Sequence, residues 1–153
     1  MEAITILERC RNAAGDIRRL TQSIRQRREA LYSISPSQAD PNGGSRSHGD
    51  QDKIGKLLAD IDALETSLKA RKQAQSVELA AACVLLDQLP ELESEVLHSY
   101  YIKHDETPGI AKRKKYQESY IRKVKNRAEK ALAELTPEQV AATLPNWYLQ
   151  NEE

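Results

Sequence analysis

The sequence predicts an all-α protein in which a long antiparallel helical hairpin, coiled-coil-like in its pattern, precedes a small helix-turn-helix domain. Strong helix formers dominate the composition, and Phe is absent. Apolar residues recur at steps of three and four along two long stretches, and the pattern shortens after Pro90. With 153 residues, 39% of them hydrophobic, the chain can bury one modest core, or a small domain beside an extended helical part.

The hairpin is predicted from two apolar seams. The first is interrupted at Arg27 and consists of Cys10, Ala13, Ile17, Leu20, Ile24, Leu31 and Ile34. The second consists of Ile54, Leu57, Ile61, Leu64 and Leu68. It then turns polar at Arg71, Gln75 and Glu78 before apolar residues resume at Ala81, which indicates a change of register or of partner. Two seams of similar length favour a hairpin within one chain, but they also allow pairing with a second copy.

The connection between the two helices is rich in Ser, Pro, Gly and Asn over residues 35–50 and predicts a flexible loop. Asp50 or Asp52 can cap the first turn of the second helix. Pro90 ends that helix because it lacks an amide donor and clashes with the preceding turn. Residues 1–88 are therefore assigned to the helical hairpin.

Shorter helices are expected within residues 89–135, which we assign to the helix-turn-helix domain. The first of them has an apolar stripe of Leu92, Val96, Leu97, Tyr100 and Tyr101. Thr107 can cap the second, with Pro108 at its first helical position. The third and longest runs from about Glu118 to Leu135, and its apolar face is formed by Ile121, Val124, Ala128, Ala131, Leu132 and Leu135.

The remaining residues, 136–153, are predicted to form a short helix and a tail. Pro137 follows Thr136 at a favourable helix start, and Pro145 ends the helix. The tail brings two aromatic residues, Trp147 and Tyr148, that can dock or stay exposed.

A turn of few residues between a short and a long helix predicts a helix-turn-helix arrangement. Residues at the crossing must let the helices approach, and the inner contacts are assigned to Ile110, Ala111, Tyr116, Ile121 and Val124. The first residues of the long helix then face outward, where they can reach base edges.

This frame resembles region 4 of bacterial sigma-70-type factors, in which an Ile-Ala pair and a Gly-Val-Ser turn precede Val-x-x-Ile and Ala-x-x-x-Leu. The matching positions, without a gap, are Ile110, Ala111, Tyr116, Ile121, Val124, Ala128 and Leu132. The resemblance covers residues 89–135. It breaks in the turn, where Lys114, Lys115 and Gln117 replace an apolar residue, a glycine and a capping serine. Because Gln caps poorly, Ser119 is a possible later cap.

The chain as a whole resembles the small phage and prophage proteins grouped with ArpU-type and RinA-type late transcription regulators. They share a helical hairpin, a Ser/Gly-rich loop and a carboxy-terminal domain similar to sigma-70 region 4. The resemblance implies a sequence-specific DNA-binding transcriptional regulator that works in the cytoplasm of a bacterial host.

The charge distribution also indicates DNA in this region. Residues 103–130 carry ten basic and four acidic residues, a net charge of +6 in a chain whose formal net charge is zero. Phosphate contacts are predicted for Lys112, Arg113, Lys114, Lys115, Lys125, Arg127 and Lys130. Base-edge contacts are predicted for Gln117, Ser119, Tyr120, Arg122 and Lys123. A merely solvated basic helix face is the alternative interpretation.

Enzymatic, metal, cofactor and membrane roles are not expected. No nucleophile stands beside a base, and no glycine loop suits a phosphate. Cys10 and Cys83 lack metal-ligand spacing and are expected to pack as small apolar residues. No run approaches the roughly 18 apolar residues of a membrane span, and the amino terminus, with Glu2, does not resemble a signal peptide.

The expected partner is double-stranded DNA, and the hairpin can contact host RNA polymerase or form a homodimer with a second copy. Two other functions fit the same pattern. One is a small terminase-like DNA-packaging subunit, which also joins a helix-turn-helix to coiled-coil helices and assembles as a ring. The other is a coiled-coil adaptor without nucleic-acid binding.

Overall fold

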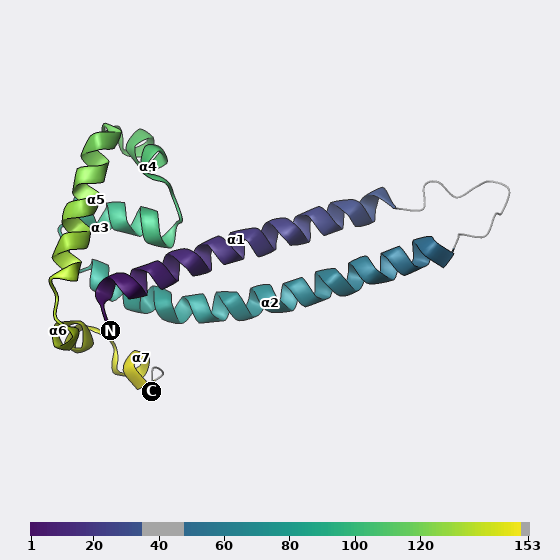
Figure 1. Cartoon of the computed structure of the whole chain (residues 1–153), viewed down its shortest axis with the longest axis horizontal. Helices are drawn as coiled ribbons and strands as arrows, with labels where there is room; N and C mark the ends of the chain where they lie inside the picture. Colours follow the sequence, from purple (N-terminus) through teal and green to yellow (C-terminus); the bar gives the residue numbers. More distant parts are fainter. Residues whose placement is uncertain (35–47, 151–153) are drawn as a thin grey trace. The chain divides into compact units, whose positions relative to one another are not determined.

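The computed structural model of the protein describes residues 1–34 and 48–150, and every regular element in these residues is helical, which confirms the all-α prediction (Figure 1). The elements are α1 (Ala3–Ser33), α2 (His48–Leu86), α3 (Glu91–Leu97), η2 (His98–Ile102), α4 (Thr107–Lys114), α5 (Glu118–Ala133), α6 (Pro137–Thr143) and α7 (Asn146–Gln150). The predicted flexible loop lies outside the described residues except for positions 48–50, which belong to α2.

The predicted hairpin forms within the chain, by antiparallel packing of α1 against α2. Its compact unit, the hairpin unit, spans Asp16–Lys72. Arg28 pairs with Glu65, and Asp16 pairs with Arg71 at 3.7 Å, so the two helices run in opposite directions. Ile24 and Ile61 are the buried residues of this unit, while the other seam positions are half-buried. Two helices can cover each other along one face only, which explains the partial burial.

A second compact unit, the core unit, combines Met1–Gly15 with Gln73–Glu153. Its main cluster takes residues from α1, α2, α3, η2, α5, α6 and α7: Ala3, Ile6, Leu7, Cys10, Ala81, Ala82, Leu85, Leu86, Leu97, Tyr101, Ala128, Leu132, Val140, Leu144 and Tyr148. The division of the chain into domains at 1–88, 89–135 and 136–153 stays a prediction. The main cluster of the core unit nevertheless contains residues from all three ranges.

The core unit accounts for the polar interruption of the second seam. Before the interruption α2 packs on α1, and after it Ala81, Ala82, Leu85 and Leu86 pack in a cluster that contains residues of both α1 and the carboxy-terminal helices. Glu78, the last polar residue of the interruption, accepts a hydrogen bond from the Tyr148 hydroxyl at 2.8 Å. Cys10 is buried in the same cluster, and burial, with Glu78 and Cys83 nearby, raises the pKa of its thiol to about 12. This thiol therefore packs as an apolar group.

The helix α6 begins where the sequence predicts, whereas α7 forms in the segment predicted as a tail. Thr136 caps α6: its hydroxyl accepts from the Gln139 amide at 3.2 Å, and its own amide donates to the Gln139 side chain at 2.9 Å. The tail adds α7, which buries Tyr148 and leaves Trp147 45% exposed.

Candidate nucleic-acid interface

The helix-turn-helix is built on a second buried cluster of the core unit. It consists of Val96, Ile110, Ala111, Ile121 and Val124, with Leu92 and Tyr100 packed against it. Four of the five predicted inner contacts are thus confirmed. The fifth, Tyr116, was assigned wrongly: it is 47% exposed, and its ring lies against the Tyr120 ring with centroids 5.2 Å apart. Tyr116 belongs to the turn rather than to either helix, so the helical spacing that buries the other four does not apply to it.

The turn between α4 and α5 depends on a left-handed residue. Lys115 has φ 61° and ψ 36°, and it follows the last residue of α4. The Tyr116 amide then donates to the Ala111 carbonyl at 3.0 Å, the six-residue bond of a helix that ends in a left-handed residue. Glycine adopts this conformation freely, whereas a side chain costs about 1 kcal/mol or more. Lysine therefore stands at a position where glycine is less strained.

Replacing this residue by glycine, Lys115→Gly, should raise the free energy of unfolding by about 1 kcal/mol, because it removes the left-handed strain. Urea titration followed by circular dichroism measures the change. The matched control is Lys112→Gly, an exposed position inside α4, which should lose about 1 kcal/mol. A loss of stability in both variants would contradict a strained Lys115.

The predicted helix caps differ from the observed ones. Thr107 is the first residue of α4, preceded by Glu106, and its side chain makes no capping bond, so that prediction was wrong. Gln117 occupies the cap position of α5 without a side-chain bond, in keeping with its poor capping ability. Ser119 lies inside the helix and does not cap it. The first amides of α5 therefore have no side-chain acceptor from the cap residue.

The outer face of α5 lies opposite its buried residues and carries Ser119, Lys123, Asn126 and Lys130, all exposed. Their spacing of four, three and four residues places them in one line along the helix. The structure thus aligns three residues predicted for base edges or phosphates. Asn126 was missed by sequence reasoning, although the same spacing identifies it. None of the four is acidic.

Two predicted phosphate-binding residues of α4 are engaged by carboxylates. Arg113 donates to Asp105 from both terminal nitrogens at 3.0 Å, and to the Ser99 hydroxyl at 3.1 Å. Lys114 pairs with Glu95, and this hydrogen bond lowers the pKa of the Glu95 carboxyl. Both cations line an open pocket of about 350 Å³ beside α3 and η2.

Two further predicted residues, both on α5, also have partners within the protein. Lys125 pairs with Glu129 at 2.7 Å and lies 4.3 Å from the centre of the Tyr100 ring. Arg127 pairs with Glu93, which is only 7% exposed. The Arg127 guanidinium offsets the cost of burying that carboxylate. These two cations thus contribute to holding α5 in place.

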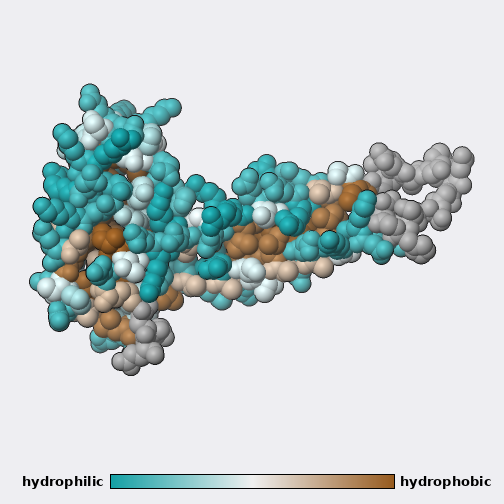
Figure 2. All heavy atoms as spheres, viewed as in Figure 1, coloured by the Kyte–Doolittle hydropathy of each residue, from teal (hydrophilic) through white to brown (hydrophobic). Residues whose placement is uncertain are grey.

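The basic residues predicted for the site therefore fall into two groups: those paired with a carboxylate within the protein and those without such a partner among the described residues. Lys112, Lys115, Lys123 and Lys130 are exposed and form no ion pair within the part of the chain that the structure describes. Gln117 and Tyr120 are exposed beside them, and Arg122 pairs with Glu118 one turn earlier in the same helix. The surface over this region is hydrophilic on the face seen in Figure 2. The assignment of each residue to bases or phosphates stays a prediction.

Arg11 of α1 is a contributor that sequence reasoning missed. Its guanidinium lies 3.7 Å from the centre of the Tyr100 ring and donates to the Tyr100 carbonyl. It also pairs with Glu106, directly before α4, at 2.7 Å. The side chain is 16% exposed. Arg11 thus links α1 to the segment that leads into the helix-turn-helix, and its partners, about 90 residues away in sequence, left no local signal.

No protein-family model, curated protein or solved structure matches this chain. The resemblance to sigma-70 region 4 and to phage regulators therefore stays a prediction. Among the described residues, no three His, Cys, Asp or Glu side chains are grouped so that they could hold a metal ion. In the same residues, no helix is both long and apolar enough to cross a membrane.

Proposed function

We propose that the protein is a sequence-specific DNA-binding transcriptional regulator of phage or prophage type, acting in the bacterial cytoplasm. One observation carries the proposal: the outer face of α5 presents Ser119, Lys123, Asn126 and Lys130 to solvent with no acidic residue among them. An α-helix fits the major groove, and a helix-turn-helix presents the start of its second helix to the base edges.

The amino-terminal half of α5 supplies the groups that read bases. Lys123 suits the O6 and N7 acceptors of guanine, and Asn126 suits the N6 and N7 pair of adenine. Gln117 can make the same adenine contact from the start of the helix, and Ser119 can bond to either base type. Arg122 reads guanine once its pairing with Glu118 is exchanged for the base.

The phosphate contacts come from three of the exposed lysines without a carboxylate partner, Lys112, Lys115 and Lys130. Lys112 and Lys115 flank the turn, and Lys130 lies two turns beyond Lys123. Lys115 keeps a charge at a strained position, which is typical of a functional residue. If three phosphates are neutralised, the logarithm of the binding constant should fall with the logarithm of salt concentration with a slope of about −2.7.

The test is fluorescence anisotropy on a labelled random-sequence duplex between 50 and 200 mM salt, roughly the range in which phosphate contacts dominate. Lys123→Ala with Lys130→Ala should reduce the salt slope by about 0.9, because Lys130 is the phosphate contact of the pair, and it should weaken binding roughly tenfold. The matched control is Lys69→Ala with Lys72→Ala, two exposed lysines of the hairpin unit, which should leave the slope unchanged. Equal effects of the two pairs would overturn the assignment of this face.

Sequence-specific binding has its own test, selection of preferred sites from a random duplex library. Asn126→Ala should relax the preference at one adenine position by about 1–3 kcal/mol while leaving binding to unselected DNA unchanged. Regulation of transcription, and contact with RNA polymerase, rest on the resemblance to phage regulators. Transcription from a template that carries the selected site, with and without the protein, tests them.

A further inference from the structure

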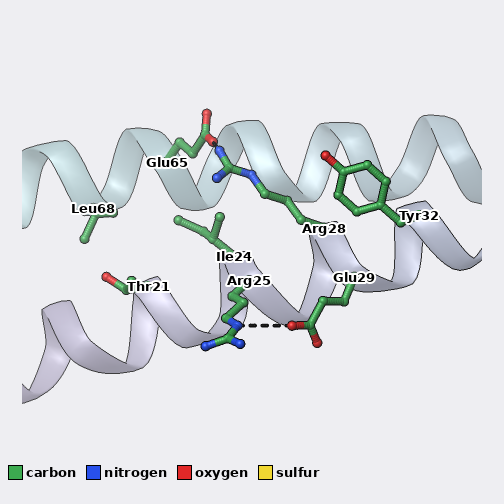
Figure 3. Close-up of a pocket in the computed structure, with 8 residues that line it drawn as sticks. All are labelled: Thr21, Ile24, Arg25, Arg28, Glu29, Tyr32, Glu65 and Leu68. Atoms are coloured by element: carbon green, nitrogen blue, oxygen red, sulfur yellow. Dashed lines mark hydrogen bonds and ion pairs between the residues drawn. The ribbon is translucent and has the colours of Figure 1, made fainter.

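The hairpin unit carries an open apolar groove on one side of its two helices (Figure 3). Ile24 of α1 and Leu68 of α2 are among the apolar groups that line it, and Tyr32 lies toward one end. Tyr32 is 77% exposed. Leu58, 51% exposed, lies two helical turns before the groove residue Glu65 and therefore on the same face of α2.

The apolar groove is part of a longer apolar surface of the hairpin unit. Figure 2 shows an apolar strip along the hairpin unit, bordered by hydrophilic residues. Only Ile24 and Ile61 are buried among the described residues of the unit, and the leucines of both seams are only partly buried. Helices in proteins, such as the two of the hairpin unit, derive most of their stability from the packing of an apolar face. A further layer of helices over the groove completes that packing.

We propose that the groove binds the same groove of a second copy of this chain, so that two hairpin units form a four-helix bundle. The charges favour a second copy over a basic or an acidic partner. Arg25 and Arg28 line the groove together with Glu29 and Glu65, and the four are paired within the unit as Arg25–Glu29 and Arg28–Glu65, so the groove carries no net charge to select a charged partner. A twofold axis brings the same patch of each copy together, so a patch with both signs in equal number can be complementary to itself.

The dimensions of the surface set the expected strength. The α1 part of the unit, residues 16–33, is about 27 Å long, and two helices side by side are about 20 Å wide. The footprint, roughly 540 Å² per copy, is at the lower end for specific interfaces. Association should therefore be weak and depend on concentration. It is independent of the proposed DNA contacts, which lie in the core unit.

Sedimentation velocity over a hundredfold range of concentration tests the proposal. The full chain should change from monomer to dimer, and Tyr32→Glu with Leu58→Glu should remain monomeric throughout. Gln26→Glu with Ser67→Glu is the matched control: both residues are exposed, neither lines the groove, the helical rotation per residue turns each away from the groove face, and the added charge is the same. This control should dimerise like the unmodified chain.

Three results would overturn the proposal: a monomer at all concentrations, a dimer that the groove variant retains, or a ring-like oligomer. Circular dichroism of both variants shows whether the hairpin stays helical. Should the groove variant lose helicity, the single Tyr32→Lys variant replaces it, because this side chain is already mostly in water. DNA binding is measured separately, so the failure of either proposal does not decide the other.

Discussion

Leu7→Ala should lower the free energy of unfolding of the core unit by roughly 3 kcal/mol. Leu7 is fully buried in α1, in a cluster that contains Ala128 and Leu132 of α5. Removing three carbon atoms from such a site costs their transfer free energy and leaves a cavity that the neighbours fill only in part. The change lies more than 100 residues before α5, yet it should weaken the support of the helix-turn-helix.

Urea titration followed by the fluorescence of Trp147 measures this effect, because this single tryptophan lies in α7 beside Tyr148, which packs in the same cluster. Leu57→Ala makes the same deletion at a half-buried position of the hairpin unit. It should shift the Trp147 transition by less than about 1 kcal/mol. If Leu7→Ala leaves that transition in place, α1 does not belong to the shared core.

Arg11→Ala should cost about 2 kcal/mol and reduce the order of the segment that leads into α4. The substitution removes a charge-assisted hydrogen bond to the Tyr100 carbonyl, the ion pair with Glu106 and the stacking on the Tyr100 ring. A hydrogen bond to a charged group contributes about 1.5–3 kcal/mol, and a cation over an aromatic face about 0.5–2. The Tyr100 carbonyl also loses a partner in a partly buried place.

Amide hydrogen exchange of residues 100–106 is the direct measurement, since their protection should fall in Arg11→Ala. The control is Arg11→Lys, which keeps the charge but loses the planar fork of donors. It should recover only part of the stability. Full recovery would show that charge alone matters, and unchanged protection in Arg11→Ala would show that this arginine does not hold the segment.

Features encoded by neighbouring residues were predicted well from the sequence. The seams predicted the hairpin because burial follows the helical period, and Pro137 marked the start of α6. Pro90 does not end α2, which stops at Leu86; it precedes α3 instead. The inner residues of the helix-turn-helix followed from the same periodicity, with Tyr116 as the exception. Tyr116 lies in the turn because Lys115 adopts a left-handed conformation. A lysine in the sequence does not predict this conformation, which is usual for glycine.

Features that depend on distant pairs could not be predicted. A count of basic residues cannot tell Lys123, which faces solvent, from Lys125, which lies over Tyr100 and pairs with Glu129. The role of Arg11 and the partner of Arg127 are of the same kind, because each depends on tertiary placement. The shared core was hidden for another reason: short apolar runs such as Ala81 to Leu86 show that they are buried, but not against what.

Both compact units meet inside unbroken helices. Gly15 and Asp16 are consecutive residues of α1, and Lys72 and Gln73 are consecutive residues of α2. The backbone hydrogen bonds of a helix can therefore continue along the chain past both boundaries. No loop separates the hairpin unit from the buried cluster along either helix. The hairpin unit should therefore unfold by gradual fraying, turn by turn, up to the buried cluster. It should not unfold in a separate cooperative transition.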